Sequence, residues 1–540
     1  LFPYTTLFRS GARAEHGIRS GPGTVTAIHR FALGAPRELA DRVRRRGSRP
    51  GERHLSAPMS GLTLASTASM LSPSRALLAG LLVLVSTGLG SSCAASSSSA
   101  DPSWSDGSSD EDVPDGPGGG AQDASPDNQP PAVGARYKGR VWGPHHDGSP
   151  PLFPISGAWV AAFAVEPDPL VQGAQCGECV SAPLGVPSTI SGADGSFELE
   201  LPLGKPLFLV VQKGNFRRTR ALVTPGAAGD YTIDQELTTL PHRLAVGDHI
   251  PRIALVYGDH DHIGDVLAKA GLAKMDGAHG VDWGSGQLEF DVYDNSGPDQ
   301  PQHGEPLSKL LDSADLLMSY DIVLFACSYN ANFAFMSKPE IQQRLRDFVW
   351  AGGKLYASDY AMPVVEMPWS SFLWFDDPLH GGCAENKFPP NCNHGPPFDS
   401  PASVIDSGLS SWLAAQGLLA GLSTKENWNT IGGISVGVVG KDPKSGADIT
   451  APPKVWLEGP WTYSSSQIQS AGKDPKAWDA SAHHPATVSW SHNCGRVLYT
   501  TYHTVGSTQG GKHPGLLPQE MVLFYLLMEL TLCQDAPVVK

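Results

Sequence analysis

Basic charge is scarce in this chain. Its 540 residues include 39 Lys and Arg against 54 Asp and Glu, which gives a formal net charge of −15. Residues 1–92 hold 12 Arg, no Lys and four acidic residues, so the remainder of the chain carries −23. A chain this acidic is repelled by nucleic acid and by anionic lipid surfaces. We therefore expect neither of them as a partner.

The N-terminal region lacks an apolar run long enough to span a bilayer. The run at 76–85 is too short for a hydrocarbon core of about 30 Å. It follows Arg75 and leads through small residues to Cys93, as in a bacterial lipoprotein signal. We expect a signal peptide at 70–92, lipidation of Cys93, attachment to a membrane through that lipid, and a cell-envelope location on the periplasmic or outer-surface side. Because Leu89 stands four residues before the cysteine rather than three, an ordinary cleaved signal with a chance cysteine is the alternative.

Segment 1–69 does not have the pattern of a folded protein. Residues 1–10 resemble the in-frame translation of a common sequencing adapter, and the residues that follow are rich in Arg and show no hydrophobic period. We interpret the segment as translated adapter and upstream DNA. Met59 and Met70 are both possible start residues, and Met70 places Arg75 where a short charged region is needed.

Large apolar residues are almost absent from segment 93–134, which consists mainly of Ser, Asp, Gly and Pro. Such a composition cannot bury enough surface to offset the entropy lost on ordering. The acidic run also lacks the ligand spacing of a calcium loop. We expect a disordered acidic linker that holds the folded part away from the membrane.

Segment 135–245 shows a hydrophobic period of two. Short runs with β-branched and aromatic residues, separated by turn signals, predict strands at 140–143, 158–165, 196–201 and 207–211. Asp194-Gly195 predicts a tight hairpin turn that needs a positive φ. We expect a small antiparallel β-sandwich. The arginines Arg217, Arg218 and Arg220 either face an acidic partner or lie at a solvated strand end.

The pattern at 189–199, followed by that at 209–216, resembles carboxypeptidase-regulatory-like domains of the carbohydrate-binding-like fold. The resemblance covers about 105 residues and implies the fold more than a ligand. Modules of this kind are mostly spacers and interaction domains, so a structural role is implied here too.

Strands and helices alternate over residues 250–535. We expect strands at 252–257, 288–293, 320–326 and 354–359. Asp261 is expected to cap a helix that ends at Gly271, and Ser337 and Glu340 form the pattern of a capping box. Repeated βα units of this length predict a doubly wound parallel sheet of the flavodoxin-like α/β class.

Two segments of this region, 347–356 and 484–503, look like parts of ThuA-like domains in the class I glutamine-amidotransferase-like superfamily. Active amidotransferases of that superfamily place a Cys on a strained, glycine-flanked turn and pair it with a His. By strand order the corresponding position here is Ser358, and no glycine flanks it. We therefore expect ordinary, unstrained strand backbone near Ser358 and near Cys327. The resemblance is therefore stronger for the fold than for the activity.

Ligands of such sheets bind outside the carboxyl ends of the strands. Polar residues expected there give the catalytic candidates Cys327, Ser358 and His503 and the ligand-binding candidates Asp259, His260, His262 and Asp359. Cys327 is alternatively an inert buried hydrophobe. The Asp and His residues of 259–262 could supply metal ligands, but neighbouring side chains point apart and one Asp is expected to cap a helix. No metal and no cofactor is therefore expected.

Eight cysteines are present, and disulfides persist in the envelope. With Cys93 lipidated, local pairing suggests three bridges and leaves Cys327 free: Cys176–Cys179, Cys383–Cys392 and Cys494–Cys533. The Cys176–Cys179 pair could alternatively be a redox or zinc motif, although its place on a loop favours a structural staple. As a whole the sequence predicts an envelope lipoprotein that binds or scaffolds, with carbohydrate or another envelope protein as the candidate partner. A hydrolase acting on a sugar or amide is the alternative.

Overall fold

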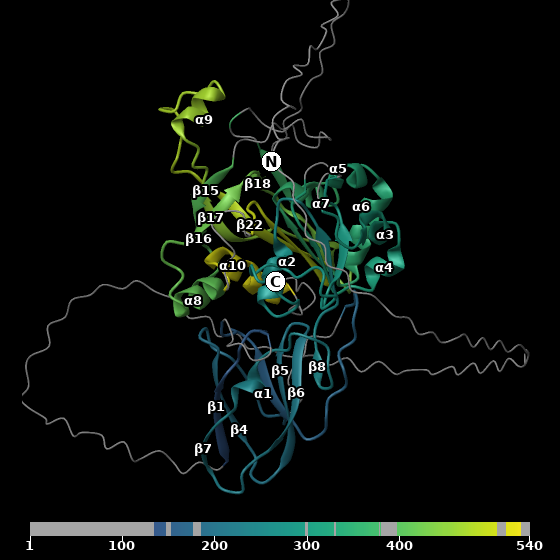
Figure 1. Cartoon of the computed structure of the whole chain (residues 1–540), viewed down its shortest axis with the longest axis vertical. Coiled ribbons are helices and arrows are strands. Elements are labelled where there is room, and N and C mark those ends of the chain that lie inside the picture. The colour runs from purple at the N-terminus through teal and green to yellow at the C-terminus, as the bar shows by residue number, and fades with distance from the viewer. Residues whose placement is uncertain are drawn as a thin grey trace, which may run out of the picture. The chain divides into compact units, whose positions relative to one another are not determined.

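The computed structural model of the chain is shown in Figure 1. The structure describes residues 134–146, 153–176, 185–297, 301–328, 331–376, 379, 397–504 and 515–530, and they all belong to one compact unit, Gly119–Lys540. The expected signal peptide, its Cys93 and nearly all of the expected linker lie outside the described residues. No described helix is long and apolar enough to cross a membrane.

The first part of the described chain forms two sheets that share one core. Each strand can turn one face toward this core because successive side chains point to opposite sides of the sheet. In β4 the side chains alternate strictly between buried and exposed, as the period of two predicted. The three-stranded sheet has the order β4-β1-β7 and the five-stranded sheet the order β3-β2-β5-β6-β8. Their bounds, with helix α1, are β1 Ala135–Arg140, β2 Trp159–Phe163, β3 Ser188–Ile190, β4 Ser196–Leu201, β5 Pro206–Lys213, β6 Phe216–Val223, β7 Gly229–Thr232, α1 Gln235–Thr238 and β8 Asp248–His249.

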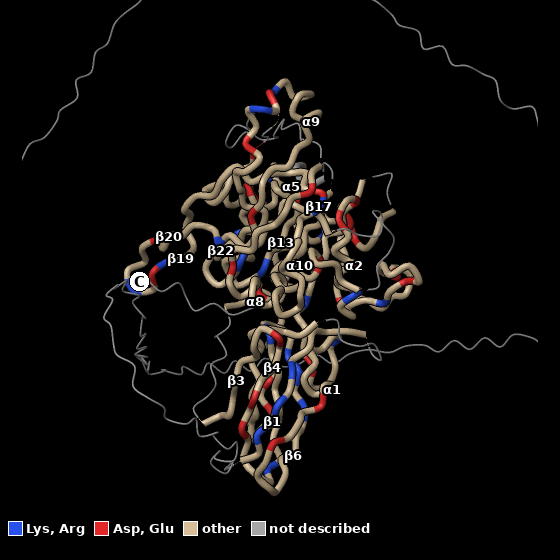
Figure 2. The backbone as a smooth tube through the Cα atoms, turned by 90° about the vertical axis from the view of Figure 1, so that its left-hand side faces the viewer, with Lys and Arg blue, Asp and Glu red and all other residues tan. Residues whose placement is uncertain are grey.

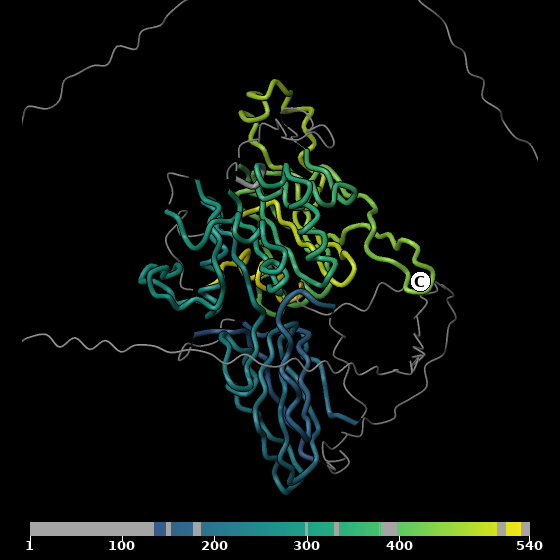
Figure 3. Tube along the Cα trace, turned by 90° about the vertical axis from the view of Figure 1, so that its right-hand side faces the viewer, coloured from purple at the N-terminus to yellow at the C-terminus, as the bar shows by residue number. Residues whose placement is uncertain are grey.

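Figure 3 shows these strands as blue-to-teal tubes that run alongside one another. All their pairings are antiparallel except that of β1 with β7, which is parallel. The expected strand at 140–143 lies earlier, at β1. Gly195 has the positive φ that the turn required, +78°. The turn is nevertheless not a hairpin, because β3 pairs with β2 and β4 pairs with β1, so the chain passes from one sheet to the other there.

Two of the arginines of β6, Arg218 and Arg220, pair with an acidic residue of the chain itself. Arg218 makes two contacts with the carboxylate of Asp248, at 3.0 and 3.1 Å, and Arg220 reaches the same carboxylate at 2.7 Å. Asp248 is buried to 5% side-chain exposure, so these are well-ordered pairs that join β6 to β8. Figure 2 shows basic and acidic residues interspersed along the strands of this region.

The second part is built on a nine-stranded sheet with the order β11-β10-β9-β12-β13-β23-β22-β21-β16. Its first six strands are parallel, and the last three are antiparallel to their neighbours. The expected parallel sheet is therefore a mixed sheet. The bounds are β9 Ile253–Tyr257, β10 Asp291–Asp294, β11 Glu305–Pro306, β12 Ile322–Phe325, β13 Lys354–Ser358, β16 Ser403–Val404, β21 Lys454–Pro460, β22 His483–His492 and β23 Gly495–Thr500.

Helices cover both faces of this sheet (Figure 1). The central strand β12 is apolar without interruption because each face of the sheet has its own core: Leu324 packs in the core with α2 and α10, and Val323 in the core with α6. The helices are α2 Ile263–Lys269, α3 Leu307–Leu311, α4 Ala314–Met318, α5 Ala331–Met336, α6 Pro339–Trp350, α7 Pro363–Glu366, α8 Ser407–Ala415, α9 Ser465–Ser470 and α10 Pro518–Leu530, with a 3₁₀ turn η1 Asp359–Ala361.

Small sheets complete the described part. They pair β14 with β18, β15 with β17, and β19 with β20. Figure 2 shows the β19–β20 hairpin extending from the edge of the molecule. Their bounds are β14 Leu373–Asp376, β15 Phe398–Pro401, β17 Ser423–Asn427, β18 Thr430–Ile434, β19 Gly437–Lys441 and β20 Asp448–Ala451.

Two expected helix caps are not formed. Helix α2 has His262 at its N-cap with no side-chain hydrogen bond, so Asp261 does not cap it. Helix α6 has Lys338 at its N-cap, also without a side-chain bond, so Ser337 and Glu340 do not form a capping box. In both cases the helix was recognised from its apolar face, and the error concerns its first residue.

Candidate functional site

Three buried side chains with different chemistries meet at the carboxyl ends of the central strands. Cys327 follows β12, Asp359 follows β13 and His503 follows β23. The strands are neighbours in the sheet in this order, so their ends lie side by side. One atom from each residue, the thiol sulfur, a carboxylate oxygen and a ring nitrogen, lies within 4.8 Å of the other two.

Asp359 occupies a strained turn directly after its strand. Its φ is +43°, in the left-handed region that a side chain with a Cβ rarely adopts. Ser358, the expected position of this turn, has ordinary extended backbone with φ −115° and ψ 139°. The expectation of unstrained backbone is thus correct at Ser358 and wrong one residue later. Lack of glycine did not prevent the turn, because an Asp fills it.

His503 lies between two carboxylates. Its Nε2 is 3.1 Å from Oδ2 of Asp359, and its Nδ1 is 3.5 Å from Oε2 of Glu426. Glu426 belongs to β17, outside the alternating strands and helices, and has a φ of +55°. The sequence offered no signal for Glu426, because neither its strand nor its backbone conformation has a local pattern.

Neighbouring groups hold Asp359 in place. The backbone N–H of Trp428 donates to Oδ2 at 3.1 Å, and the hydroxyl of Tyr499 donates to the carbonyl of Asp359 at 2.8 Å. Asn429 in turn donates to the Tyr499 oxygen at 3.3 Å. The side-chain amide of Gln519 donates to the carbonyl of His503. These contacts over-determine the strained turn, which is what allows it to persist.

Ser358 belongs to a separate network. Its hydroxyl donates to Asp261 and accepts the N–H of Cys327 at 3.1 Å. The other oxygen of Asp261 accepts the N–H of Thr504 at 2.8 Å and the Thr504 hydroxyl. No His contacts the Ser358 hydroxyl among these bonds, and the residue is fully buried. Ser358 therefore ties strand ends together through Asp261 rather than pairing with an imidazole in these bonds.

Burial and the contacts among the three side chains together shift the pKa values of the cluster. It raises the pKa of Cys327 to about 12, although His503 partly opposes the change. Burial also raises the pKa of Asp359, again against the effect of His503. For His503 burial alone would lower the pKa, but Cys327, Asp359 and Glu426 raise it well above its usual value. The thiol is therefore neutral at physiological pH.

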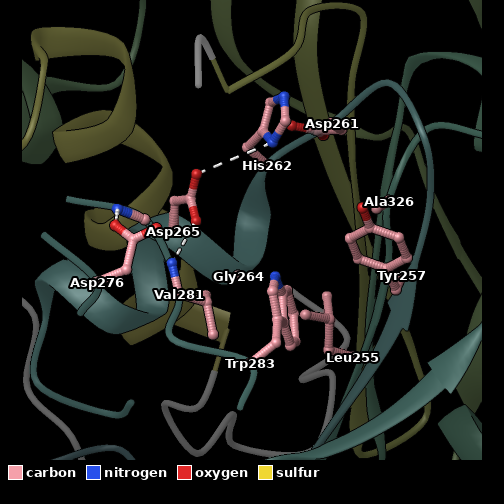
Figure 4. Close-up of a pocket in the computed structure, with 11 residues that line it drawn as sticks. Leu255, Tyr257, Asp261, His262, Gly264, Asp265, Asp276, Val281, Trp283 and Ala326 are labelled. Carbon is pink, nitrogen blue, oxygen red and sulfur yellow. Dashed lines mark hydrogen bonds and ion pairs between the residues drawn. The ribbon is translucent and has the colours of Figure 1, made fainter. Parts of the chain in front are cut away.

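A cavity of about 200 Å³ lies nearby, between α2 and the ends of β9 and β12. Figure 4 shows His262, Asp265 and Asp276 on one side of it and Tyr257 and Trp283 on the other. The ring of Trp283 stacks on His303 at a centroid distance of 4.4 Å, and Tyr257 meets Trp283 edge-on at 5.4 Å. The aromatic side is thus held in a fixed orientation.

The polar side of the cavity is partly engaged in local bonds. Oδ1 of Asp265 accepts the N–H of Val281 at 2.8 Å, while its Oδ2 lies 3.9 Å from Nδ1 of His262. Oδ1 of Asp276 accepts the N–H of Ala278 and of Gly280, at 2.8 and 2.9 Å.

The structure divides the expected site residues into two groups. Cys327, Asp359 and His503 form the buried cluster, and His262 lines the cavity together with Asp261. Asp259 and His260 do not line it. Asp259 instead accepts the N–H of Gly297 at 3.4 Å, and 48% of the His260 side chain is exposed. The cavity residues missed were Tyr257, Asp265, Asp276 and Trp283, of which only Tyr257, the last residue of its strand, stood at a position that the strand pattern marked.

The disulfide pattern differs from the expectation. Cys176 pairs with Cys494, with 5.2 Å between their Cα atoms, so neither Cys176–Cys179 nor Cys494–Cys533 is formed. Local spacing was a poor guide because the partners are 318 residues apart in sequence. Cys179, Cys383, Cys392 and Cys533 lie outside the described residues. Cys327 is free and buried, as expected.

Comparisons with known proteins add little to this. The sequence matches no protein-family profile and no curated protein. Among solved structures, a cytoplasmic protein from Salmonella typhimurium is 10% identical, with a TM-score of 0.26 over 53% of this chain and 100% of that one. A protein described as ThuA-like from Bacteroides uniformis is 12% identical, with a TM-score of 0.26 over 51% and 89%. The dioxygenase domain of a dioxygenase carbohydrate-binding fusion from Streptomyces sp. SirexAA-E is 14% identical, with a TM-score of 0.12 over 20% and 84%.

Proposed function

We propose that this protein is a cell-envelope lipoprotein whose α/β part binds a small sugar. The observation that carries the proposal is the cavity of about 200 Å³ at the ends of β9 and β12, which has carboxylates on one side and aromatic rings on the other. Membrane attachment through Cys93 is the sequence-based part of the proposal.

The strand order supports this place for a ligand. The parallel strands β10-β9-β12-β13-β23 follow the order 2-1-3-4-5, which we interpret as flavodoxin-like. In that arrangement the connections leave in opposite directions between the first and third strands, here β9 and β12, and ligands bind in the crevice at this point. The cavity is lined by Tyr257 from β9 and by Ala326, which follows β12.

The chemistry of the lining supports a sugar. A sugar ring presents hydroxyl groups at its rim and C–H groups on its faces. Asp265 and His262 offer hydrogen-bonding groups to hydroxyls, and Trp283 and Tyr257 offer aromatic surface to the C–H face. Pockets for drug-sized ligands measure about 300–1,000 Å³, so the smaller volume here favours a single ring.

The two-sheet part completes the proposal. We infer that it is a carboxypeptidase-regulatory-like spacer, because its two sheets share one core and its strand β4 alternates buried and exposed residues, as expected for a small packed sandwich. It would stand between the lipid-linked linker and the sugar-binding part. Another envelope protein is the partner that such a module would contact.

Calorimetric titration of the full-length protein with a panel of neutral monosaccharides tests the binding proposal. Trp283→Ala should reduce the affinity at least tenfold, since it removes one wall of the cavity. Trp159→Ala is the matched control, because Trp159 packs on Phe163 in the two-sheet part, away from the cavity. If no sugar in the panel binds, or if both variants weaken binding equally, the proposal is wrong.

The anchor is tested separately. Cys93→Ser should release the protein from membranes and abolish labelling by a fatty-acid analogue, because a single-chain anchor is marginal and stable attachment needs multiple acylation. Retention and labelling that persist in the variant would exclude the lipoprotein assignment without affecting sugar binding.

A hydrolase acting on a sugar or amide is the second candidate. It is favoured by the position of His503 between Asp359 and Glu426, with Asp359 on a strained turn. Cys327, Asp359 and His503 do not line the described cavity, which makes binding the better supported function. Turnover of chromogenic glycosides or amides that is lost in His503→Gln would favour the hydrolase.

A further inference from the structure

The buried cluster at the strand ends brings together the side chains that bind transition metals. We propose that Cys327, Asp359 and His503 bind one zinc ion through Sγ, a carboxylate oxygen and Nε2. This site goes beyond the proposed sugar binding, because none of the three residues lines the sugar cavity.

The distances fit a single ion. Zinc binds sulfur at about 2.3 Å, and nitrogen and oxygen at about 2.0–2.2 Å, so two of its ligands stand at most about 4.4 Å apart. The three ligand atoms here lie within 4.8 Å of one another, and Nε2 and Oδ2 are 3.1 Å apart. Small side-chain adjustments would bring all three to bonding distance.

Two buried polar atoms of the cluster lack a well-formed hydrogen bond, and a bound ion would contact them. Oδ1 of Asp359 is buried and makes no hydrogen bond within the described part of the chain, and Nε2 of His503, although 3.1 Å from Oδ2 of Asp359, makes no hydrogen bond of good geometry there. The side chains of Asp359 and His503 are 0% and 4% exposed, so both atoms lie away from the protein surface. Unsatisfied buried polar groups cost stability, and a metal ion between them satisfies both at once.

Glu426 occupies the place of an outer partner. A metal-binding His usually directs its second ring nitrogen to a carboxylate, which fixes the ring and the protonation of its nitrogens. Nδ1 of His503 lies 3.5 Å from Oε2 of Glu426, so Nε2 is the nitrogen that remains for the metal. The contact with Glu426 therefore orients the His503 ring, and it is an observation separate from the positions of the three proposed ligands.

Charge and donor type select zinc. A thiolate and a carboxylate together balance the two positive charges of the ion, which matters because an uncompensated charge is costly in a buried site. The thiol proton is released to solvent when the metal binds. Sulfur and imidazole ligands favour zinc over magnesium or calcium, which prefer oxygen. Three protein ligands leave a fourth position for water.

Metal analysis of the full-length protein tests the site. After treatment with a chelator and addition of zinc, we expect one zinc ion per chain and a higher midpoint of thermal unfolding, because an ion that binds only the folded state stabilises it. The variants Asp359→Asn and His503→Gln should each lower the zinc affinity at least tenfold.

Matched controls separate the site from a general loss of structure. Asp321→Asn and His249→Gln make the same changes at buried residues outside the cluster, and their zinc affinity should equal that of the wild type. Zinc affinity that falls equally in the controls, or a wild-type protein that binds less than one equivalent, would overturn the proposal. Because sugar titration is a separate measurement, failure here leaves the sugar proposal untouched.

Cobalt gives a readout that does not depend on stability. Substitution of Co²⁺ for zinc should produce a thiolate-to-cobalt charge-transfer band in the near ultraviolet. Cys327→Ser should remove this band while weaker visible absorption from the remaining ligands persists. Cobalt binding with no such band in the wild type would show that the thiol is not a ligand and would overturn the site as stated.

Discussion

The imidazole of His503 lies against the carboxylate of Asp359, with Nε2 and Oδ2 3.1 Å apart in a fully buried setting. The two residues follow β23 and β13, which are parallel neighbours whose last paired residues are Thr500 and Ser358. The register of the sheet therefore places Asp359 and His503 next to each other. Asp359 also carries a positive φ, a conformation that costs on the order of 1–3 kcal/mol and concentrates at functional sites.

Cys327 should be nearly inert in the native protein. Its side chain is fully buried, so iodoacetamide has no access to the sulfur. We expect alkylation of Cys327, followed by mass spectrometry of its peptide, to be at least a hundredfold slower in the native state than in urea. His503→Gln should leave the native rate slow. Rapid native alkylation that disappears in this variant would instead favour covalent catalysis and the hydrolase.

The Cys176–Cys494 bridge should stabilise the fold. A disulfide that closes a long loop contributes up to about 5 kcal/mol by restricting the unfolded chain. We expect a peptide that links the two residues in a non-reducing digest, and a lower unfolding midpoint in Cys494→Ser. The double variant Cys176→Ser/Cys494→Ser is the control and should match the single one. Peptides that link Cys176 to Cys179 would contradict the bridge.

The strands that carry the site were predictable because burial on both faces leaves an unbroken apolar run. β12 was found in this way, and the face of α6 that carries Leu345 and Phe348 was found from its helical period. The Cys176–Cys494 disulfide was not predictable, because local spacing cannot indicate which distant segments lie side by side. The turn at Asn493, next to Cys494, lies beside Trp350. In the structure the Asn493 amide donates to the Trp350 carbonyl at 2.9 Å.

The candidate site was predictable only in part, because the roles of its residues depend on contacts between segments that are distant in sequence. Strand ends placed Cys327, Asp359 and His503 together, since the order of βα units determines which ends are adjacent. The role of each residue was not accessible, because the strained φ of Asp359 depends on tertiary contacts such as that with Trp428. Glu426 comes from a strand outside the repeated units, and Trp283 from an irregular segment.

Glu366 should make stability depend on pH. Burial raises the pKa of this carboxyl, at the end of α7, to about 7 from an ordinary 4.5. Between these values the folded state keeps a proton that the unfolded state has lost. The free energy of unfolding should therefore fall as pH rises from about 4.5 to 7, by at most about 3 kcal/mol, and this contribution should then level off.

Urea unfolding of Glu366→Gln at several pH values measures this contribution. The variant should be more stable than the wild type at pH 8 and similar to it near pH 4. Glu340→Gln is the control, because Glu340 is exposed in the first turn of α6, and its effect should be small at every pH. A Glu366→Gln profile parallel to that of the wild type would show that Glu366 titrates normally.

The buried pair of Lys269 and Glu520 joins α2 to α10. Nζ lies 2.6 and 2.8 Å from the two carboxylate oxygens, and the side chains are 4% and 0% exposed. Removal of one partner leaves an uncompensated charge in the core. Lys269→Met should therefore destabilise the protein by about 3–5 kcal/mol, and Lys269→Met/Glu520→Leu should recover most of this loss.

A double-mutant cycle from urea unfolding gives the coupling between these two residues. The control is the pair of Lys309 and Glu305, whose atoms are 3.1 Å apart but whose side chains are 55% and 58% exposed. Water and salt screen that pair, so its coupling should be at most about 1 kcal/mol. If the double variant of the buried pair were as unstable as the sum of its single variants, Lys269 and Glu520 would act independently. The desolvation argument would then be wrong, because it requires that most of the loss come from the charge left behind.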